Sequence, residues 1–204
     1  MLDVVSGAER VRFAEALVGM HRDRKRVFVD RLGWQVPVVD GEFEIDQFDS
    51  ENTVYLLATD EAGRHAGSLR LLPTMGPHLL SDVFPHLCER GIPRGPDIWE
   101  ITRLCTGPDV ADPRPIRREL MLGVVEFALA NGVRRYTCMT HVPYLAAVLA
   151  VGWECMPLGL PQEDAGVTVG AIVIEITDDT LAMLRQRTGV SEPVLRRETR
   201  HAAA

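Results

Sequence analysis

Apolar residues spaced three and four positions apart mark the helices of this chain. The spacing predicts helices over residues 8–20, 20–31, 115–130, 144–151 and 178–187, with a short helical or irregular piece over 79–84. The first would bury Val11, Ala14, Leu17 and Val18. The second places Arg24 and Phe28 one turn apart on the same face and ends at Gly33. The third has the most regular buried stripe: Leu120, Val124, Phe127 and Ala128.

Runs of β-branched and alternating apolar residues fill the intervals. They predict strands over residues 2–5, 53–58, 65–72, 98–105, 135–140, 153–158 and 167–176. A turn at 61–64 makes a hairpin of the second and third. In the strand 98–105, alternation places Glu100, Thr102 and Leu104 on one face and Arg103 on the other. This order of elements predicts an α/β fold, a three-layer α–β–α sandwich around a mixed, largely central sheet.

Bulk properties limit the classes of protein. The 204 residues, 46% of them hydrophobic, suit a single domain over residues 1–190, and residues 191–204 read as a flexible tail. A net charge of −7 argues against a nucleic-acid partner. The four cysteines match no zinc spacing, so no metal site is expected. We expect a cytoplasmic protein, because a signal peptide and a membrane-spanning stretch of ~20 apolar residues are both missing from the sequence.

Residues 24–49 are the most unusual part of the sequence, because they combine arginines, aromatic residues and carboxylates. Arginine binds carboxylates in a planar, forked geometry, and aromatic rings cover flat ligand surfaces or contact cations. Carboxylates hold ammonium groups. The residues after Trp34, up to position 50, have no clean period and predict a long ordered loop, a feature that is usually functional. The combination suits a small zwitterion that carries an additional positive charge.

The pattern resembles the signature of the LuxI-type acyl-homoserine-lactone synthases. The matching residues are Arg24, Phe28, Trp34, Asp46, Asp49, Arg70, Phe84, Glu100 and Arg103. The resemblance covers about residues 1–187 and implies the fold of the GCN5-related N-acetyltransferases. It also implies an acyltransferase that joins an acyl group from a thioester to the amine of S-adenosylmethionine. The product would then form a lactone and release methylthioadenosine.

The resemblance implies a role for each signature residue. The S-adenosylmethionine site would comprise Arg24, Phe28, Trp34, Asp46, Asp49 and Arg103, and the catalytic set would be Glu100, Arg103, Arg24 and Asp46. Taken singly, the arginines could lie on the surface, the acidic residues could form a solvated loop, and the aromatic residues could be ordinary core. Glu100 has two competing interpretations: a general base, acting directly or through water, or a structural ion pair with Arg70.

An apolar pocket would hold the acyl chain. The candidates are Phe84, Leu104, Met121, Leu122, Val125, Thr137, Met139, Leu145, Val148, Leu149 and Trp153, most of which would be core in any fold. Thr137 and Thr140 could bond an acyl-chain oxygen or could simply favour a strand. His78 and Asp82 form a weak HxxxD pattern that we interpret as structural, and we expect His141 at the cleft edge or in the core.

The acyl donor could be acyl-coenzyme A or acyl carrier protein, and Arg117, Arg118, Arg134 and Arg135 could meet either one. The segments 81–87 and 157–161 favour the subgroup that uses branched or aromatic acyl-coenzyme A. No tightly bound cofactor is expected, and the oligomeric state stays open. One alternative is an acetyl-coenzyme A-dependent N-acetyltransferase, but residues 105–115 lack its Gly-rich pyrophosphate loop. A non-enzymatic ligand sensor on the same scaffold is the second.

Overall fold

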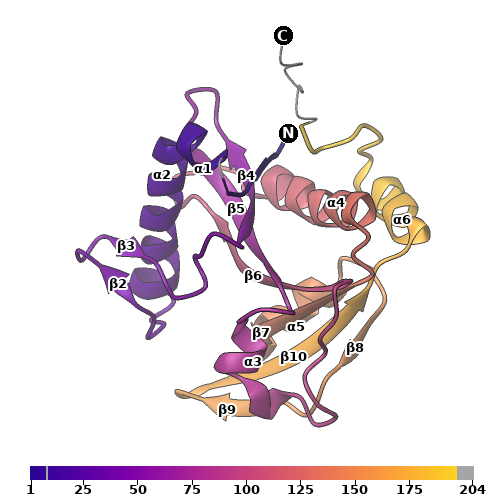
Figure 1. Ribbon diagram of the computed structural model, residues 1–204. Helices are drawn as coiled ribbons and strands as arrows, with labels where there is room; N and C mark the ends of the chain where they lie inside the picture. The colour runs from indigo at the N-terminus through magenta and orange to yellow at the C-terminus, as the bar shows by residue number, and fades with distance from the viewer. Residues whose placement is uncertain (8, 197–204) are drawn as a thin grey trace.

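A twisted sheet with helices on both faces makes up the structure, a computed structural model that describes residues 1–7 and 9–196 (Figure 1). The strand order is β1-β4-β5-β6-β7-β10-β8, and β9 pairs with β10. The strands are β1 (Asp3–Val5), β4 (Val54–Thr59), β5 (His65–Pro73), β6 (Ile98–Thr106), β7 (Arg135–His141), β8 (Cys155–Pro157), β9 (Gln162–Asp164) and β10 (Val167–Glu175). All neighbours are antiparallel except the β6–β7 pair, so the sheet is mixed as predicted.

Helices cover the two faces unequally. One face carries α4 (Arg114–Asn131), α5 (Val142–Leu149) and α6 (Asp178–Thr188). The other carries α1 (Glu9–Arg12), α2 (Ala14–Arg24), the π-helical turn η1 (Lys25–Arg31), α3 (Leu79–Asp82) and the 3-10 turn η2 (Pro85–Leu87). A small hairpin, β2 (Val38–Val39) and β3 (Phe43–Glu44), lies within the predicted loop. These layers confirm the predicted α–β–α sandwich.

The main core lies between the sheet and α4. The predicted stripe of that helix is buried in full, and Gly132 ends the helix in the left-handed conformation, at φ +69°. Leu56, Leu69 and Leu71 face it from the sheet. The opposite face contains smaller apolar clusters and, beside them, buried charges. The buried charged residues therefore lie on the face of the sheet that α2, η1 and α3 cover.

The predicted buried stripe of the first helix is wrong. Val11 is 84% exposed and Val18 is 46% exposed, and the buried positions follow a spacing of four: Ala16, Met20, Arg24 and Phe28. The helix also continues through Met20 as α2 and η1. An apolar pattern could not reveal this face, because its central residue is an arginine that packs onto carboxylates.

The predicted alternation along β6 fails at Arg103. Its backbone has φ +52°, in the left-handed region, opposite a register shift in β5 between Ser68 and Arg70. As a result Arg103 and Arg70, the partner of Thr102, both donate to the carboxylate of Asp46, while Leu104 is 41% exposed. The β6–β7 pairing runs only from Ile98 to Ile101 on the β6 side, so the two strands separate beyond that point.

The flexible tail predicted from residue 191 begins too early. Val194 is buried, and the Leu2 backbone N–H donates to its carbonyl at 2.7 Å. The carboxylate of Glu126 accepts the backbone N–H groups of Val194 and Leu195. Arg196 pairs with Asp3 at 3.1 Å, so the packed chain continues through residue 196. Residues 197–204 lie outside the described residues.

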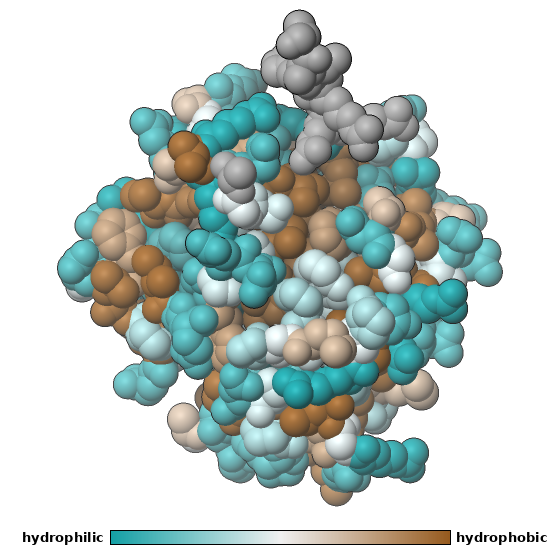
Figure 2. All heavy atoms as spheres, in the orientation of Figure 1, coloured by the Kyte–Doolittle hydropathy of each residue, from teal (hydrophilic) through white to brown (hydrophobic). Residues whose placement is uncertain are grey.

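The surface mixes residue types. Figure 2 shows hydrophilic and hydrophobic residues interspersed over one face. The most exposed large apolar side chains, Val11, Leu160 and Met75, belong to separate segments, which is ordinary for a globular protein. Within the described residues, no helix is both long and apolar enough to cross a membrane.

Candidate active site

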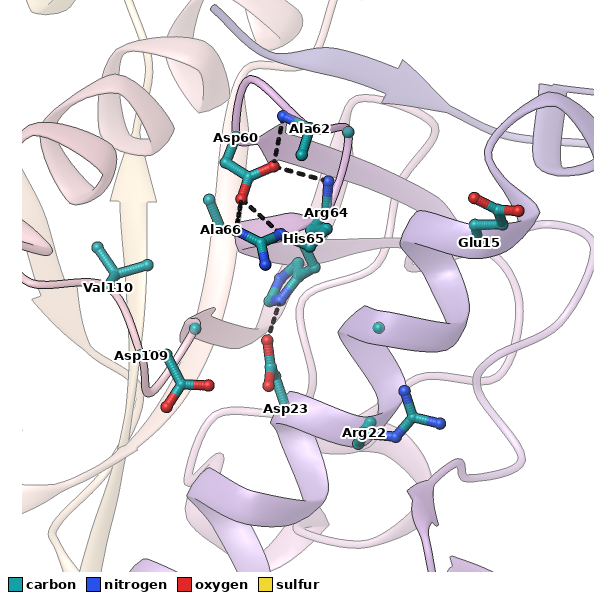
Figure 3. Close-up of a pocket in the computed structure, with 13 residues that line it drawn as sticks. Glu15, Arg22, Asp23, Asp60, Ala62, Arg64, His65, Ala66, Asp109 and Val110 are labelled. Carbon is teal, nitrogen blue, oxygen red and sulfur yellow. Dashed lines mark hydrogen bonds and ion pairs between the residues drawn. The ribbon is translucent and has the colours of Figure 1, made fainter.

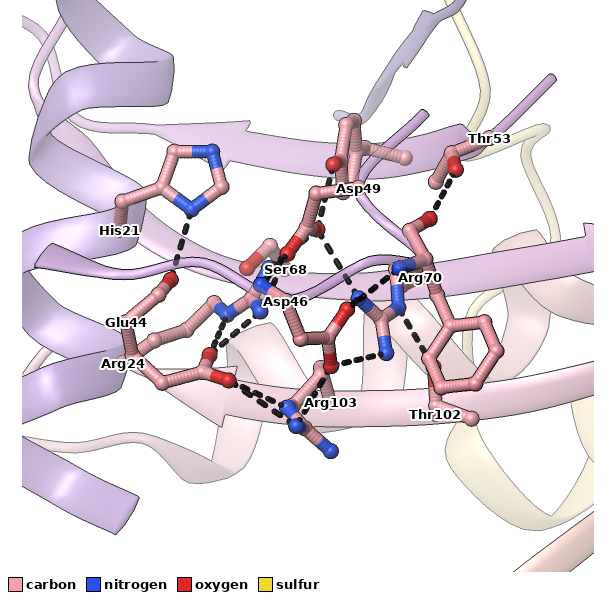
Figure 4. Close-up of polar contacts among 12 residues, drawn as sticks. His21, Arg24, Glu44, Asp46, Asp49, Thr53, Ser68, Arg70, Thr102 and Arg103 are labelled. Atoms are coloured by element: carbon pink, nitrogen blue, oxygen red, sulfur yellow. Dashed lines mark hydrogen bonds and ion pairs between the residues drawn. The ribbon is translucent and has the colours of Figure 1, made fainter. Parts of the chain in front are cut away.

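Three arginines and three carboxylates form a buried network beneath α2 (Figure 4). Arg24 donates to both oxygens of Asp49, at 2.9 and 3.0 Å, and its Nε donates to Glu44. Arg70 (from β5) binds both oxygens of Asp46, at 2.6 and 3.0 Å. Arg103 (from β6) bridges Glu44 and Asp46, at 2.9 and 2.7 Å. The six formal charges cancel, which makes this burial of ions possible.

The network engages its arginines unequally. The guanidinium of Arg24 is 1% exposed and faces Asp49 and Glu44, so the predicted direct grip of Arg24 on a substrate carboxylate is not what this geometry offers. Arg70 is also enclosed, and its Nε donates to Thr102 at 2.9 Å. Arg103 uses only Nε and Nη2, and its Nη1 has no partner among the described residues. Arg103 is thus the arginine positioned to meet a ligand.

Electrostatics in the network follow from burial and pairing. Burial alone would raise the pKa of Asp49, but the charge and hydrogen bonds of Arg24 and the charge of Arg70 hold it well below its usual range. Burial and the Asp49 charge raise the pKa of Tyr55, whose hydroxyl donates to Asp49 at 2.7 Å. Asp49 is therefore held as the carboxylate between Arg24 and Arg70.

Glu44 is a residue of the network that the family signature does not include. It is fully buried at the end of β3 and joins Arg24 to Arg103. Its carbonyl also contacts Nδ1 of His21 at 3.0 Å. Its spacing two residues before Asp46 was the available signal, because alternate residues of an extended segment point the same way.

Aromatic residues wall the open side of Arg103. Phe28 and Trp34 stack with ring centroids 4.7 Å apart, and the Arg103 guanidinium lies 5.7 Å from the Phe28 centroid. The rings of His141 and Trp34 have centroids 5.0 Å apart, so His141, predicted at the cleft edge or in the core, lies beside this wall. Within the described residues, the buried Nε1 of Trp34 has no hydrogen-bond partner. The walls and the free donors fit a ligand with a flat group and an anionic end.

The predicted ion pair between Glu100 and Arg70 does not form. The Glu100 carboxylate accepts the backbone N–H groups of Leu79 at 2.6 Å and Leu80 at 2.9 Å, while Arg70 is committed to Asp46 and Asp49. Burial raises the pKa of Glu100 to about 7, although the two N–H donors oppose the shift. Such a carboxylate changes protonation state near neutral pH, which a general base requires.

The predicted acyl-pocket residues do not form one cluster. Phe84, Thr137 and Met139 lie on the face that carries Glu100, where the buried hydroxyl of Thr137 has no partner among the described residues. The residues that pack into the core on the α4 face are Met121, Leu122, Val125, Leu145, Val148 and Trp153. Leu104 and Leu149 are exposed, at 41% and 47%.

A separate cavity of about 360 Å³ lies between α2, the β4–β5 hairpin and the loop after β6 (Figure 3). Its arginines are neutralised, Arg64 by Asp60 at 2.7 Å and Arg22 by Glu42. His65 links Asp23 at 2.8 Å to Ser68 at 3.0 Å, a chain that resembles a hydrolase triad. Ser68 is buried and does not line the cavity, so we do not assign the reaction to this cavity.

The chain is similar to known proteins over most of its length. The family model described as autoinducer synthase matches residues 9–184. An acyl-homoserine-lactone synthase of Ralstonia solanacearum is 39% identical over 168 residues, covering 79% of this chain and 82% of the relative. An isovaleryl-homoserine lactone synthase of Bradyrhizobium diazoefficiens is 34% identical over 191 residues, covering 93% and 86%.

Solved structures give the same result. The coenzyme A-dependent acyl-homoserine lactone synthase BjaI, solved with S-adenosylmethionine and isopentyl-coenzyme A, has a TM-score of 0.87 at 33% identity, over 96% of this chain and 92% of that one. A Lactobacillus plantarum protein described as a putative N-acetyltransferase has a TM-score of 0.60 at 16% identity, covering 86% and 99%, which shows the fold alone. The relatives of 30% identity or more define the class of the protein as an acyltransferase. The chain belongs to the autoinducer synthase family, which confirms the predicted resemblance and enzyme class.

Proposed function

We propose that this chain makes an acyl-homoserine lactone from S-adenosylmethionine and an acyl thioester. One observation carries the proposal: the free Nη1 of Arg103 lies beside the Phe28–Trp34 stack, on the same strand as Glu100. The arginine suits the methionine carboxylate, and the aromatic rings suit the sulfonium and the flat adenine. Because the charges of Asp46 and the rest of the network cancel, the network does not repel the cationic substrate.

Amide formation is the first step. The α-amine attacks the thioester carbonyl, the carbon–sulfur bond breaks, and the thiol leaves after taking up a proton. The attacking amine must first lose its own proton, and Glu100 accepts it, directly or through a water molecule. Its pKa of about 7 suits this role. Backbone N–H groups at the separation of β6 and β7 stabilise the carbonyl oxygen as its charge develops.

Lactone formation is the second step. The methionine carboxylate attacks its own γ-carbon, the bond from that carbon to sulfur breaks, and methylthioadenosine leaves as a neutral thioether. Since the reaction is intramolecular, holding the chain in a curled conformation supplies most of the acceleration. Arg103 orients the carboxylate, while Arg24 and Arg70 act by fixing Asp49, Asp46 and Glu44.

The donor in this proposal is an acyl-coenzyme A with a short, branched chain. Two observations support this choice. The relatives named above include an isovaleryl-homoserine lactone synthase and a coenzyme A-dependent enzyme. The apolar residues near Glu100 also pack closely around Leu80, Phe84 and Met139. Since both substrates are cytoplasmic metabolites, we infer a cytoplasmic enzyme without a tightly bound cofactor.

The test is turnover by the purified chain with S-adenosylmethionine and isovaleryl-coenzyme A, followed by mass spectrometry. We expect isovaleryl-homoserine lactone and methylthioadenosine in equal amounts, and their loss in the Arg103→Lys variant. Coenzyme A release without methylthioadenosine, in the presence of a simple amine, would indicate an N-acyltransferase instead. Binding of S-adenosylmethionine without turnover of any coenzyme A or carrier-protein thioester would indicate a sensor.

A further inference from the structure

Glu100 has a second set of contacts that proton transfer does not require. Both carboxylate oxygens accept backbone N–H groups, Oε2 from Leu79 and Oε1 from Leu80, in the first turn of α3. The carboxylate is fully buried and reaches across 20 and 21 residues of sequence. A general base needs only one oxygen free to accept a proton. The role of a base therefore does not explain why both oxygens are hydrogen-bonded to α3.

Helix α3 depends on this contact. It has only four residues, Leu79–Asp82, which is too short to be stable alone. The first N–H groups of a helix have no partner within the helix. His78 and Ser81 cap each other at its start, and the N–H groups of Leu79 and Leu80 are left to Glu100. Glu100 therefore fixes the position of α3 against β6.

The two residues held by Glu100 also shape the apolar part of the site. Leu79 packs with Phe48 and Leu72, and Leu80 packs in a second cluster with Leu87 and Ala171. The side chains that contact both clusters are Phe84 and Met139, two predicted acyl-pocket residues. Any shift of the first turn of α3 would move both clusters at once.

We propose that Glu100 is a positioning residue for acyl selectivity: by holding the backbone of Leu79 and Leu80 it fixes the α3 wall that decides which acyl groups fit. This inference rests on the proposed function, because it assigns the apolar clusters beside α3 to the acyl group. It adds a role to Glu100 that does not depend on removing a proton from the amine.

The test uses donor binding without S-adenosylmethionine, so that no amine is present to be deprotonated. Isothermal titration measures the Kd of isovaleryl-coenzyme A and of octanoyl-coenzyme A for the wild-type chain, Glu100→Gln and Asp82→Asn. Glutamine has one acceptor oxygen, so it can hold only one of the two N–H groups. Asp82 is an exposed carboxylate on the same helix and is the matched control.

We expect the Kd of octanoyl-coenzyme A divided by that of isovaleryl-coenzyme A to fall about tenfold in Glu100→Gln, which is the size of one lost charge-assisted hydrogen bond. The same ratio should stay unchanged in Asp82→Asn. Hydrogen exchange should show faster exchange of the Leu79 and Leu80 amides in Glu100→Gln. Loss of turnover with an unchanged Kd ratio would overturn the inference and leave Glu100 as a base alone. Failure of the wild type to bind either donor would instead overturn the proposed function.

A second variant covers the case in which Glu100→Gln does not fold. Leu80→Ala keeps the carboxylate and removes part of the α3 wall. We expect the preference of this variant to shift toward octanoyl-coenzyme A, relative to the branched donor, by at least about tenfold. An unchanged preference in Leu80→Ala would show that α3 does not line the acyl site, and the inference would fail.

Discussion

Replacing Glu44 with glutamine removes one negative charge from the buried network and leaves its three arginines facing two carboxylates. Glu44 is fully buried and accepts hydrogen bonds from Arg24 and Arg103, so both guanidinium groups lose a charged partner. Water cannot replace that partner without opening the packing of α2 on the sheet. The substitution therefore tests whether the network is a structural unit as well as a binding site.

The expected magnitude follows from the burial of the pair. Removing one partner of a buried ion pair costs about 3–5 kcal/mol. For a domain of this size, each kcal/mol lowers Tm by about 2–4 °C, so Glu44→Gln should melt about 6–20 °C below the wild type. Glu42 gives the matched control, because it pairs with Arg22 with both side chains about half exposed, at 48% and 47%. Glu42→Gln should cost less than about 1 kcal/mol.

Thermal unfolding followed by circular dichroism measures both variants at one pH and salt concentration. Equal melting temperatures for Glu44→Gln and Glu42→Gln would refute the reasoning, because they would mean that the buried pair contributes no more than an exposed one. Turnover measured below both melting temperatures separates stability from function. We expect Glu44→Gln to lose activity there as well, because Arg103 is released from one of its two anchors.

Four further predictions concern Glu100, Arg103 and Leu104. Turnover should rise between pH 6 and 8 with an apparent pKa of about 7, because the deprotonated form of Glu100 is the base; a rise that persists in Glu100→Gln would contradict this. Since that pKa lies above the ordinary value of 4.5, the folded state binds the proton more tightly, and the free energy of unfolding should fall between pH 4.5 and 7 in denaturant titrations. Arg103→Lys should lower kcat/KM about 100-fold, because lysine lacks the forked donors; a drop below about fivefold would count against it. Leu104→Ala should change acyl selectivity less than about twofold in competition assays, because the side chain is 41% exposed; a larger change would place it in the pocket.

The sequence predicted those parts of the fold that local rules determine. Helix α4 and the β4–β5 hairpin appear as expected, because their apolar periods match their burial. The backbone turn at Arg103 was beyond reach, since it depends on a register shift in the neighbouring strand β5. The packing of residues 194–196 against the domain could not be predicted either, because it depends on pairing with Leu2 and on hydrogen bonds to Glu126.

The predicted site residues came together where charges had to find partners, and not where apolar residues had to find a pocket. Arg24, Asp46, Asp49 and Arg103 meet because buried ions have few stable arrangements. The acyl-pocket candidates divided between two faces, because apolar side chains pack equally well on either side of a sheet. Spacing in the sequence therefore predicted which charged residues lie together far better than which apolar residues do.

The balance of the network bears on how the lactone forms. A carboxylate held by two forked arginines would lose much of its nucleophilicity, since both oxygens would be engaged in charge-assisted hydrogen bonds. In the proposed site, Glu44, Asp46 and Asp49 occupy the guanidinium groups of Arg24 and Arg70, and Nη1 of Arg103 is the charged donor that the described residues leave to the substrate. One charged donor can orient the carboxylate and leave its second oxygen to attack the γ-carbon. The three acidic residues thus limit how tightly the site holds the group that must react.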